Sequence, residues 1–186
     1  MKTTRERFVK THKKEYQQVP GKGLRKKIVY TGDYYTWTPE KGSIESTRKL
    51  FLILEILTII IFGISSIPGT VISYSNITIG AAILSFVVWA FEAFGVFSFC
   101  LRKLPLQEDD YAYTKWSFRI GFPLRFVLLI VSVVTGFIYM SDKGYETSSI
   151  LALIGYLITA LIAAFLFFTF IKLSKYETVI PGDSSK

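Results

Sequence analysis

The chain has 186 residues, of which 51% are hydrophobic, and its mean hydropathy is +0.39. This composition excludes a disordered chain and is unusual for a soluble domain, so it indicates an integral membrane protein. One cysteine and one histidine exclude a disulfide framework, a multi-histidine metal site and most histidine-based catalysis, and we expect no metal and no cofactor.

The excess positive charge lies ahead of the first apolar segment. Of the formal net charge of +8, residues 1–49 carry 13 basic and 5 acidic side chains, whereas residues 50–186 carry 9 of each. A basic segment beside a membrane is attracted to anionic headgroups by about 1 kcal/mol per Lys or Arg. We therefore expect residues 1–49 to form a cytoplasmic arm that contacts anionic lipid. Nucleic-acid binding is not expected, because no nucleic-acid motif accompanies the basic residues.

The arm contains an aromatic stretch that predicts a short β-hairpin. β-Branched and aromatic residues at 28–37 flank the turn-forming tripeptide 31–33. An isolated hairpin is marginal in water, so this one should pack on the headgroups as an aromatic collar or dock onto a partner protein. Residues 3–18 lack proline and glycine, which leaves a charged helix open there. The docking candidates are the basic and aromatic residues Arg25, Lys26, Lys27, Tyr30, Tyr34, Tyr35 and Trp37.

Four apolar runs follow, each about 18–25 residues long, which is the length a helix needs to cross a hydrocarbon core of roughly 30 Å. Backbone groups in lipid must be satisfied within the segment, which favours helices. We predict an all-α integral membrane protein in which residues 50–171 form a four-helix transmembrane bundle. The expected spans are Leu50–Ile67, Ile77–Leu101, Ile120–Met140 and Ile150–Ile171.

The connections between these runs differ in charge. Residues 68–76 contain no Lys or Arg, and residues 141–149 contain one. The other Lys and Arg residues after the first run fall in residues 102–119 and in the tail 172–186, apart from one within the third run. Because basic loops stay on the cytoplasmic side, we expect a multi-pass protein of the cell membrane with both termini cytoplasmic.

Three ionisable residues lie inside the expected spans, where such residues are expensive and mark candidate functional sites. Glu55 and Arg125 have similar depths from the cytoplasmic side, so they either pair with each other or extend separately to the headgroups. Glu92 lies near the middle of its span, on a helix face that contains small and polar residues. It is either a proton carrier, a cation ligand or a counter-ion, or it is a structural acid that is hydrogen-bonded or paired with a basic residue of a partner subunit.

Small residues recur at four-residue spacing in the last two spans, a pattern that lets helices approach closely. They serve packing within the bundle or an interface with a second copy or partner. These candidates are Ser132, Gly136, Gly155, Thr159 and Ala163.

No combination of nucleophile, base and orienting group is visible, so we do not expect an enzyme. The leading hypothesis is a non-catalytic accessory or scaffold subunit of a membrane complex, which docks membrane or cytoplasmic proteins through its arm. The alternative is a small oligomeric transporter or channel that uses Glu92 as an ion- or proton-coupled residue.

Overall fold

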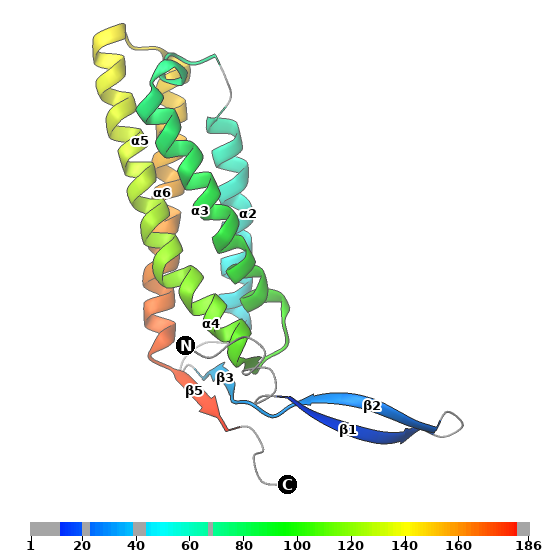
Figure 1. Cartoon of the computed structure of the whole chain (residues 1–186). Coiled ribbons are helices and arrows are strands. Elements are labelled where there is room, and N and C mark those ends of the chain that lie inside the picture. Colours follow the sequence, from blue (N-terminus) through cyan, green and yellow to red (C-terminus); the bar gives the residue numbers. More distant parts are fainter. Residues whose placement is uncertain (1–11, 20–22, 39–43, 67–68, 182–186) are drawn as a thin grey trace, which may run out of the picture.

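The structure is a computed structural model that describes residues 12–19, 23–38, 44–66 and 69–181, and it is mostly helical (Figure 1). Its elements, in chain order, are β1 (His12–Val19), β2 (Gly23–Tyr30), β3 (Tyr34–Trp37), α2 (Ile44–Ser65), η1 (Val71–Tyr74), α3 (Asn76–Leu101), β4 (Leu106–Gln107), α4 (Glu108–Trp116), η2 (Ser117–Gly121), α5 (Phe122–Lys143), α6 (Thr147–Ser174) and β5 (Glu177–Ile180).

Three helical segments in the described residues are long and apolar enough to cross a membrane, and these are α3, α6 and the continuous helix Glu108–Lys143. The first expected span corresponds to α2, which begins at Ile44, six residues earlier than expected. Three charged residues, Arg48, Lys49 and Glu55, lie within the 22 residues of α2, so composition alone does not identify α2 as a membrane span. Figure 1 nevertheless shows α2 running alongside the other helices.

The third expected span is part of a longer helix that extends toward the N-terminus through α4. Pro123 lacks an N–H, and in a regular α-helix its ring would collide with the carbonyl of Arg119. The wider π turn of η2, which contains Arg119, occurs at this point, so the helix continues past the proline.

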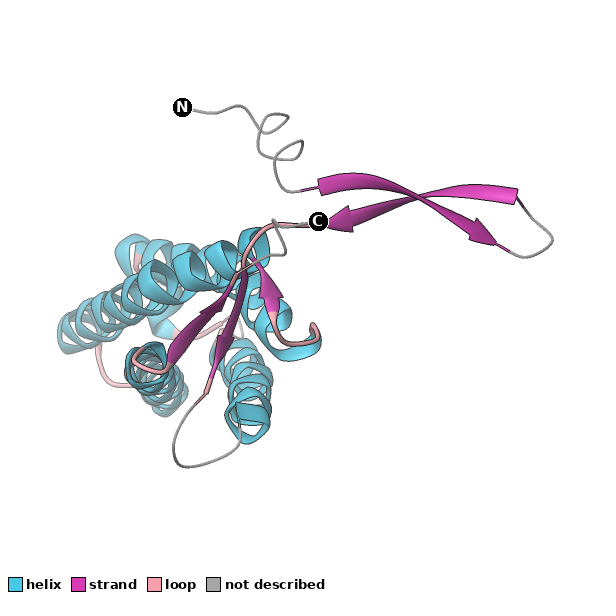
Figure 2. Ribbon diagram, turned by 90° about the horizontal axis from the view of Figure 1, so that it is seen from below, coloured by secondary structure: helices cyan, strands magenta, loops and turns pink. Residues whose placement is uncertain are grey.

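A small antiparallel sheet lies at one end of the bundle (Figure 2). Its central strand, β3, pairs with β4 on one side and with β5 on the other. The segment before α2, the α3–α4 connection and the segment after α6 therefore meet at the same end. Arg48 strengthens this end by donating hydrogen bonds from Nε to the Phe99 carbonyl (2.6 Å) and from Nη2 to the Cys100 carbonyl (2.8 Å).

The predicted hairpin over residues 28–37 is wrong. Residues 28–30 end β2, which pairs with β1 from His12↔Tyr30 to Val19↔Gly23. Residues 34–37 instead form β3 on the end of the bundle, where Trp37 is buried. If residues 34–37 paired with residues 28–30 in a local hairpin, the aromatic surface of residues 34–37 would stay in water. Burying this surface on the end of the bundle is more favourable. The arm therefore carries a hairpin nearer the N-terminus, and residues 12–19 are a strand rather than a helix; residues 3–11 lie outside the described residues.

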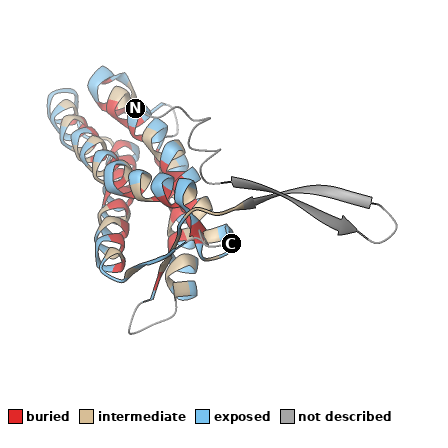
Figure 3. Cartoon of the chain, turned by 60° about the horizontal axis from the view of Figure 1, so that its bottom comes forward, coloured by how far each residue is buried: buried red, intermediate tan, exposed pale blue. Residues whose placement is uncertain are grey.

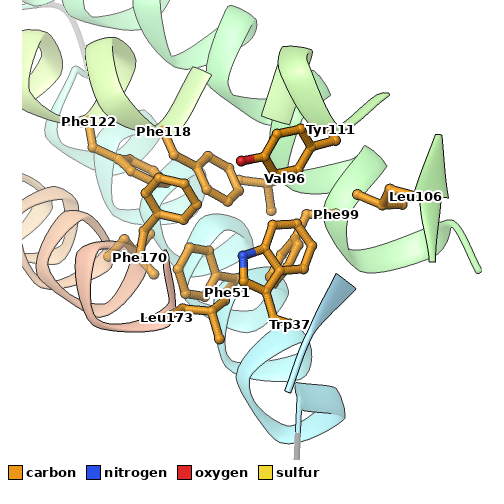
Figure 4. Packing of buried hydrophobic residues seen from close by; sticks show 11 residues of the cluster. Trp37, Phe51, Val96, Phe99, Leu106, Tyr111, Phe118, Phe122, Phe170 and Leu173 are labelled. Atoms are coloured by element: carbon orange, nitrogen blue, oxygen red, sulfur yellow. The ribbon is translucent and has the colours of Figure 1, made fainter. Parts of the chain in front are cut away.

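Buried residues lie mainly on the helix faces turned toward the interior of the bundle, and exposed residues lie on the outer faces (Figure 3). At the sheet end, aromatic rings from β3 and four helical segments form one core, which includes Trp37, Phe51, Phe99, Phe118 and Phe170 (Figure 4). A second core lies toward the opposite end. The outward faces of α2, α3, α5 and α6 carry large apolar side chains, which suits contact with lipid.

Small residues permit the closest helix contacts. A Cβ atom at Gly155 of α6 would lie 1.7 Å from Oγ of Ser65 in α2, and one at Gly136 of α5 would lie 2.7 Å from a Leu153 methyl in α6. Ser132 donates a hydrogen bond to the Thr78 carbonyl (3.2 Å). Thr159 and Ala163 are also buried. All five predicted packing residues therefore lie in contacts within the bundle.

The close approach of α2 and α6 at Gly155 predicts the effect of an alanine there, with an alanine at Gly80 as the control. Gly155→Ala should destabilise the protein by about 1–3 kcal/mol, because the new methyl group pushes α2 away from α6. Gly80→Ala, in α3, meets no atom within 4 Å and should be neutral or stabilising by up to about 1 kcal/mol. Thermal unfolding in detergent measures both variants, and equal melting temperatures would contradict the α2–α6 contact.

Candidate functional site

Arg125 lies in the bundle interior between two carboxylates from two other helices. Its Nη1 atom is 3.2 Å from Oε1 of Glu55 in α2 and 3.0 Å from Oε2 of Glu92 in α3. The exposed fractions of Arg125, Glu55 and Glu92 are 1%, 2% and 0%. We call these three residues the buried triad. Of the two alternatives for Glu55 and Arg125, the structure has the ion pair, and it adds Glu92 to the same guanidinium.

The triad lies deep in each helix and between the two apolar cores. Glu55 is about 17 Å along α2 from its first residue, and Glu92 is about 14 Å from the end of α3, at 1.5 Å per residue. A glycine brings the third helix close, because a Cβ at Gly121 would lie 2.4 Å from Cγ of Glu92. The π turn that ends at Gly121 is thus in direct contact with Glu92.

The charges of the triad do not balance when every group is ionised. Two carboxylates and one guanidinium give a net charge of −1, and an uncompensated buried ion costs several kcal/mol. A proton on one carboxylate removes this charge and also the repulsion between Glu55 and Glu92. The neutral form of the triad therefore contains one proton on two carboxylates.

The two carboxylates are not equivalent. Nη1 of Arg125 donates a hydrogen bond to Glu55 Oε1. Among the described residues, neither oxygen of Glu92 has a hydrogen-bond partner, although Oε2 lies within ion-pair distance of the same nitrogen. Because charge-assisted hydrogen bonds favour the ionised form, Glu55 is the better carboxylate for Arg125, and Glu92 is the better site for the proton.

Two grooves of about 550 Å³ each approach the triad from opposite ends of the bundle. The α3–α4 groove lies toward the sheet end, between α3 and the helix that contains α4, η2 and α5. Glu92 adjoins this groove, but its carboxylate is fully buried. The α2–α3 groove lies toward the other end and includes the hydroxyl groups of Ser66, Thr70 and Tyr156.

A separate void of about 10 Å³ lies between the α2–α3 groove and Arg125. The groove and the void share the side chains of Ile59, Phe62 and Phe86, which separate them. The void also borders Thr58 and Arg125, and within the described residues Thr58 Oγ1 and Arg125 Nε have no hydrogen-bond partner. Its size is about that of one water molecule. These two unpartnered groups therefore lie on the side of the triad that faces the α2–α3 groove, next to a void whose accessible wall is apolar.

The aromatic candidates of the arm are largely used inside the molecule. Trp37 is 2% exposed and meets Phe99 edge-on at 5.2 Å between ring centroids, while Tyr35 stacks on Tyr111 at 4.0 Å. The hydroxyl of Tyr30 accepts a hydrogen bond from the Glu108 backbone (3.1 Å). Trp37 is thus not available to a partner. Tyr34 lies beside Tyr30, and Arg25, Lys26 and Lys27 are in β2.

Sequence reasoning missed two features of the site. Helical spacing indicated the inward face of α3 that contains Glu92, but not that Arg125 would lie opposite it, because the π turn changes the register of the third helix. The contact of Gly121 with Glu92 was also missed. A glycine two residues before a proline inside an apolar run was the one available signal.

No protein-family model, no curated protein and no solved structure matches this chain. Within the part of the chain that the structure describes, no three His, Cys, Asp or Glu side chains gather as a metal site.

The charge balance of the buried triad predicts that removing one carboxylate costs much less unfolding free energy than removing both. Glu92→Gln should change the free energy of unfolding by less than about 1 kcal/mol, because Glu55 still neutralises Arg125. The double variant Glu55→Gln/Glu92→Gln should lose about 3–5 kcal/mol, because it leaves a buried guanidinium without a counter-ion. Chemical unfolding in detergent measures both, and a double variant as stable as the single one would rule out the buried pairing.

Proposed function

We propose that the protein spans the cell membrane four times and has both termini in the cytoplasm. The 22 residues of α2 extend about 33 Å, enough for a hydrocarbon core of roughly 30 Å. Glu55, in the middle of α2, is paired with Arg125, which reduces the cost of placing it there. The shared sheet supports a common side for β3, β4 and β5, and the basic connections support the cytoplasm as that side.

The function that the site supports best is proton movement through Glu92 in a small transporter. The observation that carries this proposal is the position of Glu92. It lies beside Arg125 without accepting its hydrogen bond, and its buried side chain adjoins the α3–α4 groove. A proton on Glu92 gives a neutral triad. When the proton leaves, the adjacent guanidinium reduces the cost of the resulting carboxylate. The same site can therefore hold Glu92 in its protonated form and in its ionised form.

The two grooves support a route for the proton. The α3–α4 groove approaches the buried Glu92 from the sheet end of the bundle. The α2–α3 groove and the small void approach Arg125 from the opposite end. Arg125 and Glu92, together with the apolar side chains of Ile59, Phe62 and Phe86, thus lie between the two openings. Exchange of the proton on Glu92 across this barrier would connect the two sides.

Proton flux into liposomes tests this function. Reconstituted protein should speed the acidification of a lumenal pH dye under an imposed membrane potential that is negative inside. Glu92→Gln should reduce the rate to that of protein-free liposomes, because glutamine carries no exchangeable acid proton, and Glu92→Asp should retain part of the flux. Unchanged flux in a folded Glu92→Gln variant would refute the proposal.

A second candidate function rests on the β1–β2 hairpin. It projects from the end of the bundle (Figures 1 and 2), and among the described strands β1 and β2 pair only with each other. A two-stranded ribbon is marginal alone, so a partner would stabilise it. This observation favours a non-catalytic accessory or scaffold subunit that docks through its basic arm.

Removal of residues 1–30 distinguishes the two candidate functions. A transporter should keep its proton flux without these residues, whereas a docking subunit should lose its stoichiometric partner.

A further inference from the structure

Four aromatic rings form a continuous row across α6, α2 and α3. Tyr156 of α6 packs against Phe62 of α2 with 5.6 Å between the ring centroids. Phe62 stacks on Phe86 of α3 at 5.8 Å, and Phe86 stacks on Trp89, about one turn further along α3, at 5.4 Å. The ring planes of these two stacked pairs differ by only 18° and 21°. We call Phe62, Phe86 and Trp89 the aromatic stack.

The aromatic stack separates the α2–α3 groove from the void beside Arg125. Phe62 and Phe86 line both the groove and the void, whereas Trp89 lines only the void. The void has room for about one water molecule, and its accessible wall is apolar. Protons move along continuous files of water, and a narrow apolar passage does not hold such a file. The stack therefore closes this side of the proposed proton route.

We propose that the aromatic stack is a gate to the buried triad, and that Phe86 is the side chain that moves to open it. This inference rests on the proposed function, because it names the groups that regulate proton access to the triad. A hydrophobic constriction blocks water and ions while it is closed, and it admits them when a side chain turns aside. Opening changes no covalent bond and requires only rotation about the side-chain bonds of Phe86.

Phe86 is the ring of the stack that has space to move. Its exposed fraction is 42%, and that of Ile83, about one turn earlier on α3, is 58%, so this side of α3 faces outward. Phe62 is half-buried and lies between Phe86 and Tyr156, and Tyr156 is only 6% exposed. Exposed side chains change rotamer within picoseconds to nanoseconds. Rotation of Phe86 toward lipid is therefore the easiest way to part the rings.

Polar groups behind the stack favour the open state. Thr58 Oγ1 and Arg125 Nε are buried and have no hydrogen-bond partner among the described residues, and both residues line the void. Water that enters past Phe86 would give these groups partners. The free energy gained by satisfying a buried polar group is similar in size to that of a stacked aromatic pair. Closed and open states are therefore close in free energy.

Reaction of a buried thiol with silver ion tests the gate in the full chain in nanodiscs. Cys100 is the one cysteine of the sequence, so Thr58→Cys in a Cys100→Ser background places a single thiol at the void. Maleimide labelling after denaturation measures the thiol that silver has left unreacted. Phe86→Ala should speed the reaction by about 10-fold or more, because opening no longer requires movement of a ring.

Two further variants make this test specific. Phe86→Trp should slow the reaction, because a larger ring strengthens the closed stack, so the prediction has a direction for both substitutions. Phe94→Ala is the matched control: Phe94 is also on α3 and is 65% exposed, but it lines neither the α2–α3 groove nor the void. Its reaction rate should equal that of the parent. Proton flux through Glu92 should be faster in Phe86→Ala and slower in Phe86→Trp.

The outcomes distinguish the gate from the function on which it rests. Equal reaction rates with all three side chains at position 86 would overturn the gate, and flux that still depends on Glu92 would leave proton movement intact. A Phe94→Ala variant that reacts as fast as Phe86→Ala would assign the effect to general loosening of the bundle and would also overturn the gate. Faster reaction in Phe86→Ala alone, without flux that depends on Glu92, would support the gate and reject the transport function.

Discussion

A guanidinium buried in the apolar interior of a helix bundle must have a counter-ion, and this requirement connects the main features of the structure. Arg125 meets it with Glu55 on one neighbouring helix and approaches Glu92 on another. These contacts join α2, α3 and the continuous helix Glu108–Lys143 near the middle of their lengths. Because one cation faces two acids, the same contacts also create a place for one exchangeable proton. Stability and the proposed chemistry therefore depend on the same three side chains.

The rest of the chain supports this arrangement from the sheet end. Trp37 and the surrounding aromatic rings close that end of the bundle, and β3 connects its two neighbouring segments through β4 and β5. The π turn before Pro123 permits a continuous helix, and Gly121 at its end leaves space for Glu92. This irregular turn also contributes part of the wall of the groove beside Glu92. Such π segments often occur at functional sites.

Much of the helical architecture was predictable. A long apolar run in lipid must satisfy its own backbone hydrogen bonds, and a helix does so within the segment. The ends of the helices were less predictable: polar residues at 44–49 and 108–116 continue α2 and the third helix outside the apolar runs. The pairing of β3 with strands more than 70 residues away had no local signal, so the aromatic stretch was interpreted as a hairpin. The triad was predictable only in part, since helical spacing indicates which face of a helix is buried, but not which residue lies opposite Glu92.

The central claim is that two buried carboxylates hold one proton, and infrared spectroscopy of the purified protein at neutral pH tests it most directly. The account predicts a carboxylic-acid carbonyl band that disappears in Glu92→Gln. The same band should also disappear in Glu55→Gln, because Glu92 then becomes the ionised partner of Arg125. A band that is missing from the unmodified protein, or that persists in either single variant, would contradict the claim.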